Sequence, residues 1–193
     1  MRRFIQIVEN AQTAIIYHTT SNGSAGQILA QCALNAGRNR EGTPFISLSE
    51  KPLIGNVEIG DRADVSIGFH PYAFWGKIEP VVYTEQWYDA NREKATYIAG
   101  EGWWHQWEPP EDAYDEEGFE NEEVYGAAHR DAELDSFLDK SAEHEWVTRE
   151  PYESLRFRPE DVVVLVIDNQ AEVTEWQNIL RSEGYEHVRV VVL

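Results

Sequence analysis

Short apolar runs separated by polar turns divide the first part of the chain into alternating strand and helix patterns. The segment TAIIYHTT (13–20) is rich in β-branched and aromatic residues and leads into polar SNGS, which predicts a strand ending in a turn. SAGQILAQCALNAG (24–37) follows with helical spacing, between Ser24 as a candidate N-cap and Gly37 as the stop. The apolar stripe of this predicted helix is Ile28, Leu29, Cys32 and Ala33.

The same pattern predicts three more elements before the C-terminal part. TPFISLSEKP (43–52) and PVVYTEQWY (80–88) are predicted strands, and a short helix is predicted to start at Asp89. In DAELDSFLDKSAEHEWVT (131–148) the apolar spacing changes from helical to alternating, which predicts a helix leading into a strand.

The C-terminal part has the clearest pattern. DVVVLVIDN (161–169) is a continuous apolar run, typical of a strand buried on both faces. VTEWQNILRSEGY (173–185) has the spacing of an amphipathic helix that ends at Gly184, and HVRVVVL (187–193) predicts a final strand. This tail alone fits a small α/β layer.

A strongly acidic segment interrupts the chain. Between residues 101 and 140 there are fourteen Asp and Glu residues against Arg130 and Lys140, a local charge of −12. Its stretch EPPEDAYDEEGFENEEVYG (108–126) has no clear period, which predicts a long loop or a partly disordered insertion. We therefore predict one domain over residues 1–193 with an acidic loop insertion at about 101–140.

The composition of the chain excludes several classes of protein. A hydrophobic content of 42% with seven Trp is too high for a disordered chain. The single cysteine, Cys32, excludes an intramolecular disulfide, and without paired cysteines or HExxH spacing we predict no metal site. The net charge of −19 makes direct binding to nucleic acid or anionic lipid unfavourable. The apolar runs are too short for a signal peptide or a membrane span, which predicts a cytoplasmic protein.

Three predicted strands offer polar side chains that suit a catalytic site. Residues i and i+2 of a strand emerge on one face about 7 Å apart. Glu143 and Glu145 in EHEW therefore share a face, as do Ser47 and Ser49 in FISLSE, while IIYHTT contributes His18. Each motif alone is also explained structurally, by a solvated face, an edge strand or cap, or a buried histidine.

The order of these motifs resembles the ADP-ribosyltransferase-like superfamily. The resemblance lies in YHTTSNGSAGQIL, FISLSEKP, FLDKSAEHEW and RFRPEDVVVLVIDN, within residues 13–169. More narrowly, it is to the AbiGi-type abortive-infection proteins and their relatives. It implies an α+β fold with a split β-sheet core and flanking helices, to which the charge pattern adds the acidic insertion. The implied function is that of an NAD-dependent ADP-ribosyltransferase or NAD glycohydrolase in toxin, phage-defence or counter-defence biology.

The resemblance also implies roles for individual residues around NAD, which would be the substrate. Glu145 would stabilise the oxocarbenium cation formed when the nicotinamide–ribose bond breaks, and Glu143 would orient or deprotonate the acceptor. His18 would hold the adenosine ribose, and Ser47 would hold either Glu145 or the nicotinamide amide. The chain combines the His of one branch of the superfamily with the Ser-x-Ser and Glu-x-Glu of another. The other implied NAD contacts are Thr19, Ser49, Arg38 and Arg40, with the two arginines offered to the pyrophosphate.

Two alternatives rest on the charge. The chain can be an acidic interaction protein, such as an antitoxin, an inhibitor or a nucleic-acid mimic, that binds a basic protein through residues 101–140. The acidity, with only four lysines, can also reflect a salty cytoplasm. The cluster WWHQW (103–107) is either a lid over the core or a binding platform.

Overall fold

The computed structural model describes residues 14–38, 44–55, 63–99, 108–114, 121–139 and 145–193. Two compact units make up the chain. The first consists of Met1–Pro80 and Glu143–Leu193, and the second is Val81–Ala142. The second unit is therefore inserted in the sequence of the first.

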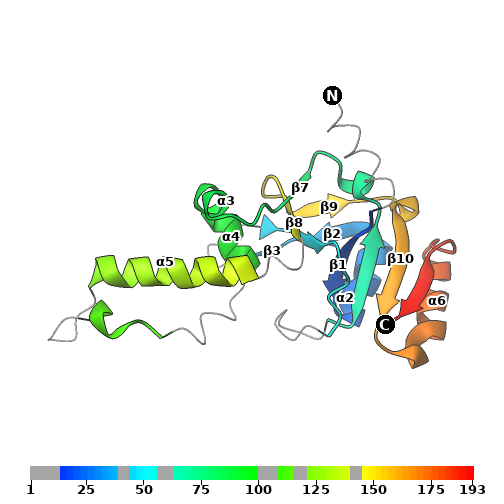
Figure 1. The fold of residues 1–193 in the computed structure, drawn as a ribbon. Coiled ribbons are helices and arrows are strands. Elements are labelled where there is room, and N and C mark those ends of the chain that lie inside the picture. Colours follow the sequence, from blue (N-terminus) through cyan, green and yellow to red (C-terminus); the bar gives the residue numbers. More distant parts are fainter. Residues whose placement is uncertain (1–13, 39–43, 56–62, 100–107, 115–120, 140–144) are drawn as a thin grey trace. The chain divides into compact units, whose positions relative to one another are not determined.

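A seven-stranded sheet organises the first unit (Figure 1). Its strands are β1 (Ile16–Thr20), β5 (Ser47–Ser49), β6 (Val65–Phe69), β7 (Ile78–Pro80), β8 (Glu145–Thr148), β10 (Val162–Ile167) and β11 (Arg189–Val192). They lie in the order β11-β10-β6-β1-β5-β8-β7. The β10–β11 pair is parallel and the other pairs are antiparallel. The prediction of an α+β fold is confirmed.

The described part of the first unit also contains two small strand pairs and short helical turns. The pairs are β2 (Ala33–Asn35) with β9 (Ser154–Arg156), and β3 (Gly37–Arg38) with β4 (Pro44–Phe45). The turns are η2 (Pro71–Phe74), η6 (Pro159–Asp161) and η7 (Gln170–Glu172).

The core of this unit lies on one face of the sheet. Ile16 of β1 pairs with Phe69 of β6, and strand partners share a face. Both belong to one buried apolar cluster, to which helices α2 (Asn22–Gln31) and α6 (Val173–Ser182) contribute their buried residues. The two helices thus supply the apolar cover that an amphipathic strand requires on its hydrophobic side.

The C-terminal elements match their prediction. The run at 161–169 forms β10, which is buried along nearly its whole length, and the amphipathic pattern forms α6. Gly184 follows this helix with φ +83°, a conformation that favours glycine. The final strand is β11.

The first helix is shorter than predicted. Ser21, rather than Ser24, is its N-cap and accepts a hydrogen bond from the Ser24 amide. The helix ends at Cys32, which adopts the left-handed conformation with φ 50°, so Cys32 and Ala33 do not continue the helical stripe. The strand β2 follows because its backbone pairs with β9, and the cap carbonyl of Cys32 accepts the amide of Phe157. These tertiary hydrogen bonds override helix propensity.

Two predicted strands are also only partly right. The segment 43–52 forms β4 and β5, with a break at Ile46, whose carbonyl accepts the Thr148 amide of β8. In 80–88 only Pro80 is in a strand, and the prediction is wrong beyond it because Thr84 caps a helix by accepting the Trp87 amide. The sequence pattern also missed β6, the strand between β10 and β1.

The second unit is helical in its described part. Its helices are α3 (Glu85–Ala90), α4 (Arg92–Ala99) and α5 (Glu122–Asp139), with a short turn η4 (Glu111–Ala113). Phe137 of α5 is fully buried among aromatic side chains. Its ring stacks on Trp87 at 5.6 Å with an interplanar angle of 2°, and it also contacts the rings of Tyr83 and Tyr88.

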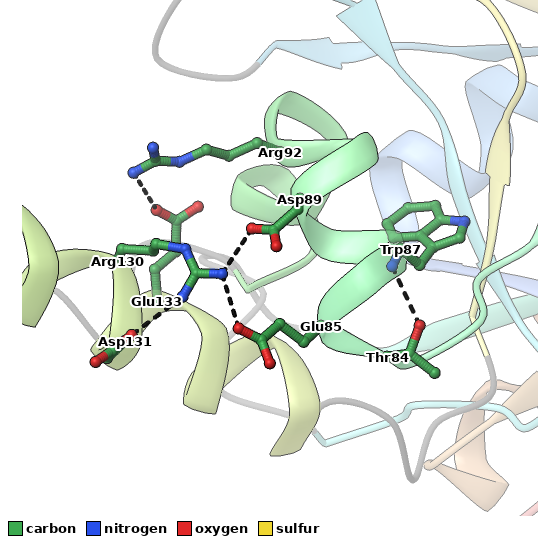
Figure 2. Close-up of polar contacts among 8 residues, drawn as sticks. All are labelled: Thr84, Glu85, Trp87, Asp89, Arg92, Arg130, Asp131 and Glu133. Atoms are coloured by element: carbon green, nitrogen blue, oxygen red, sulfur yellow. Dashed lines mark hydrogen bonds and ion pairs between the residues drawn. The ribbon is translucent and has the colours of Figure 1, made fainter.

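Polar contacts join the same helices (Figure 2). Arg130 of α5 reaches Glu85 at 3.0 Å and Asp89 at 2.7 Å, both on α3. Glu133, one turn further along α5, is buried and lies 3.9 Å from Arg92 of α4. The second unit therefore has an apolar aromatic core bordered by ion pairs.

The loop predicted for residues 108–126 is wrong for Glu122–Gly126, which belong to α5, whereas the helix leading into a strand predicted within 131–148 is confirmed by α5 and β8. Two acids, Glu122 and Glu123, occupy its first turn, where negative charge favours a helix. Leu134 and Phe137 then supply the buried face. Of the described helices, none has the length and apolar character required to cross a membrane.

Candidate active site

The three strands that carry the predicted site residues are neighbours in the sheet. His18 lies on β1, Ser47 and Ser49 form the ends of β5, and Glu145 begins β8. The strand order places β5 between β1 and β8. Residues that are far apart in the sequence are thereby brought together by the sheet topology.

Ser47 and Glu145 are in direct contact. The Ser47 hydroxyl donates a hydrogen bond of 2.9 Å to Oε2 of Glu145. Glu145 is 8% exposed, so its carboxylate is held in a largely dehydrated position. A buried carboxylate needs hydrogen-bond donors to remain charged, and the hydroxyl supplies one. The resemblance offered Ser47 either Glu145 or the nicotinamide amide as a partner, and the structure contains the bond to Glu145.

Strand register fixes the face on which Glu145 lies. Glu145 pairs with Ser49, and Ser49 pairs with Tyr17, so the three residues form a row across β8, β5 and β1. Leu48 and Trp146 point to the opposite face, towards the apolar core. Glu145 therefore emerges on the face of the sheet away from α2 and α6.

His18 belongs to the core face. It pairs with Ile67 of β6 and alternates with Tyr17, so its side chain shares the face of Ile16 rather than that of Glu145. The sequence suggested that the three strands present their polar groups to one ligand. In the structure His18 is instead connected to Glu145 through hydrogen bonds of Ser47.

The connection occurs where β1 and β5 are weakly joined. These strands share the registered pair Tyr17–Ser49, whereas β1 and β6 share five pairs. Nδ1 of His18 lies 3.2 Å from the carbonyl oxygen of Ser47. Because a carbonyl only accepts, Nδ1 carries the proton, and Nε2 of the neutral ring is an acceptor.

Burial lowers the pKa of His18, while the hydrogen bond to the Ser47 carbonyl opposes this shift. The ring is therefore neutral at pH 7. A neutral donor holds the Ser47 peptide without placing a positive charge beside Glu145.

Thr19 and Ser49 have structural partners. The Thr19 hydroxyl lies 2.6 Å from the Ser66 hydroxyl and accepts the Leu53 amide at 3.2 Å. The Ser49 hydroxyl donates to the Lys51 carbonyl at 2.6 Å. Both side chains thus fasten the turn after β5 to the sheet, and their binding to NAD stays a prediction.

The other predicted site residues are Arg38, Arg40 and Glu143. Arg38 of β3 pairs with Pro44 of β4, and Pro44 precedes Ser47 by three residues in the sequence. Arg40 and Glu143 lie outside the described residues. Across the described part of the chain, no three or more His, Cys, Asp and Glu side chains are grouped to hold a metal ion.

Two residues beside the site were missed from the sequence. Ser66 is fully buried and bonds Thr19, and Gly68 lies opposite Tyr17. The alternation of VSIGF, with large apolar residues on one face and small residues on the other, was the available signal.

No protein-family model, curated protein or solved structure matches the chain.

Proposed function

We propose that the protein cleaves the nicotinamide–ribose bond of NAD and transfers ADP-ribose to an acceptor or to water. The observation that carries this proposal is the Ser47–Glu145 hydrogen bond on adjacent strands. It places a carboxylate at a defined position, held by a hydroxyl donor from the neighbouring strand. The resemblance of the chain to ADP-ribosyltransferases assigns the same two residues to this chemistry.

The reaction needs stabilisation of positive charge. The bond between the anomeric carbon of the ribose and the nicotinamide nitrogen breaks, and the nitrogen keeps the electron pair as neutral nicotinamide leaves. The oxocarbenium cation that remains is attacked by an acceptor nucleophile, which then loses its proton. Glu145 would stabilise the cation, because a preorganised anion in a poorly hydrated site interacts strongly with charge that develops there.

The two glutamates should separate cleavage from transfer. We expect Glu145→Gln to abolish both nicotinamide release and labelling of acceptors from labelled NAD in cell extract. Glu143→Gln should retain part of the release and lose most of the labelling, because an acceptor-side base is needed only for transfer. Removal of a general base costs about a hundredfold or more in rate. Equal and negligible effects of both substitutions on an active protein would contradict the assignment.

A second candidate function rests on the charge of the second unit. Val81–Ala142 contains seventeen acidic and four basic residues, so it carries −13 of the −19 of the chain. The acids of α5 that are exposed are Glu122, Glu123, Asp131, Asp135 and Asp139. This surface favours docking of a basic protein, with association that weakens steeply as salt increases.

The second candidate is tested by neutralising that helix. A variant with Glu122, Glu123, Asp135 and Asp139 changed to Gln or Asn should lose a basic partner that wild type retains at low salt. A bound partner that the variant keeps with the same salt dependence would remove this function. The two functions are compatible, because the acids of α5 and the Ser47–Glu145 pair belong to different units.

A further inference from the structure

We infer that His18 is a positioning residue for Glu145, acting through the backbone of Ser47 rather than by contact with the reacting groups. This inference rests on the proposed function. It departs from the role in ribose binding that the resemblance implies for His18. The residues involved form a continuous hydrogen-bonded path across β1, β5 and β8.

The first step is the difference in faces. His18 shares the core face with Ile16, whereas Glu145 lies in the Tyr17–Ser49 row on the opposite face. A side chain on the core face does not meet a ligand that contacts Glu145 from the other side. The Ser47 carbonyl lies near the plane of the sheet, so it can be reached from the core face while the Ser47 side chain points the other way.

The second step is the weak junction between the strands. On the β8 side, Ser47 is fixed by the ladder pair with Val147. On the β1 side, the registered ladder is Tyr17–Ser49, and it does not include Ser47. The bond from His18 Nδ1 to the Ser47 carbonyl therefore takes the place of a ladder hydrogen bond. It holds the Ser47 peptide at the point from which the hydroxyl must aim at Oε2 of Glu145.

The third step is the protonation state. Burial keeps the imidazole neutral, and the carbonyl partner keeps the proton on Nδ1. A cationic side chain in this position would compete with the forming ribose cation for the charge of Glu145. A neutral donor fixes geometry without that competition.

Two substitutions separate positioning from ligand contact. The amide nitrogen of Asn reproduces the place of Nδ1, and that of Gln reproduces the place of Nε2. We expect His18→Asn to retain the Ser47 bond and to keep kcat within about threefold of wild type. His18→Gln should lower kcat by about tenfold or more with little change in KM for NAD, because misplacement of a catalytic group affects the chemical step.

A measurement without NAD makes the test independent of activity. The side-chain carboxyl 13C resonance of Glu145, assigned by its loss in Glu145→Gln, should be unchanged in His18→Asn and displaced in His18→Gln. Long-range 15N spectra of the wild-type ring should show the proton on Nδ1. Thermal unfolding of both variants establishes that each is folded, and Ser47→Ala gives the resonance expected when the hydroxyl is absent.

Several results would overturn the inference. One is a proton on Nε2 of His18 in the wild-type protein. Another is a Glu145 resonance that His18→Asn preserves no better than His18→Gln. A third is that His18→Gln retains kcat while His18→Asn raises KM for NAD. The last pattern would assign His18 to ligand contact. If wild type does not cleave NAD, the proposed function fails, whereas the resonance of Glu145 still decides whether His18 positions it.

Discussion

Gly68 is closely surrounded by side chains in the sheet beside the candidate site. A Cβ added there would lie 2.5 Å from Cγ1 of Val164, 2.8 Å from Cγ2 of Ile15 and 3.0 Å from Cε1 of Tyr17. These atoms belong to side chains within the folded unit, so they cannot all move away without repacking. Glycine is required here by close approach rather than by backbone conformation.

We predict that Gly68→Ala destabilises the protein by about 1–3 kcal/mol, the usual cost of overpacking a core. The midpoint of urea unfolding would measure it. Gly26→Ala is the matched control, because a Cβ at Gly26 meets nothing within 4 Å and Ala is the better helix former in α2. Equal urea midpoints for the two variants would contradict the tight packing around Gly68.

The candidate site shows what residue types can and cannot predict. The chemistry of Glu145 and Ser47 follows from their side chains, and the resemblance offered Glu145 as one of two partners for Ser47. Their shared face, and the opposite face of His18, depend on the Tyr17–Ser49 and Glu145–Ser49 registers. Register is set by pairing between distant segments, so the local sequence does not contain it.

At the scale of elements, prediction succeeded where local pattern and tertiary environment agree. The run that became β10 and the amphipathic α6 have strong periodicities and clear ends. It failed where a tertiary partner decided the outcome. The helical pattern of α2 continues past Cys32 in the sequence, but the residues that follow pair with β9. The apolar run after Pro80 leads into helix α3 instead of forming a strand. Short apolar runs are compatible with both strand and helix.

The helices of the second unit provide a pH-dependent test. Tyr88 of α3 is fully buried, and its burial, followed by the negative charge of Glu133 on α5, raises the pKa of its hydroxyl from 10.0 to about 12. The folded state therefore keeps the phenol protonated at a pH at which the unfolded chain has lost the proton. Unfolding between about pH 10 and 12 releases a proton, so the free energy of unfolding must fall across this range.

We predict that the urea midpoint of wild type, followed by circular dichroism, falls more steeply from pH 10 to 12 than that of Tyr88→Phe. The substitution removes the titrating hydroxyl and preserves the ring that packs on Phe137. The two proteins should behave alike below pH 10, where the phenol is neutral in both states. Parallel curves over the whole range would show that Tyr88 titrates normally.

At the scale of the whole molecule, the second unit is inserted at a favourable point of the first. It begins after Pro80, the last residue of β7, and the chain returns at β8, where Trp146 is the ladder partner of Pro80. The two ends of the first unit at this point are therefore already adjacent. Insertions of this kind leave the host core intact, because few of its contacts depend on the connecting segment.

We predict that replacing Val81–Ala142 by a short Gly/Ser linker leaves the first unit folded. The near-ultraviolet circular dichroism of its buried aromatic residues, which include Phe69 and Trp176, should be retained with a cooperative thermal transition. Loss of that transition would mean that the first unit requires the inserted one. The same variant should retain the pairing of β7 with β8.

The most direct test of the central claim is a crystal structure of Glu145→Gln with NAD bound. Gln preserves the shape of the side chain and its hydrogen-bonding oxygen while preventing cleavage. The account predicts that the nicotinamide ribose lies within hydrogen-bonding distance of residue 145, on the face shared with Ser47 and Ser49. NAD bound elsewhere on the protein, or no bound NAD at millimolar concentration, would contradict it.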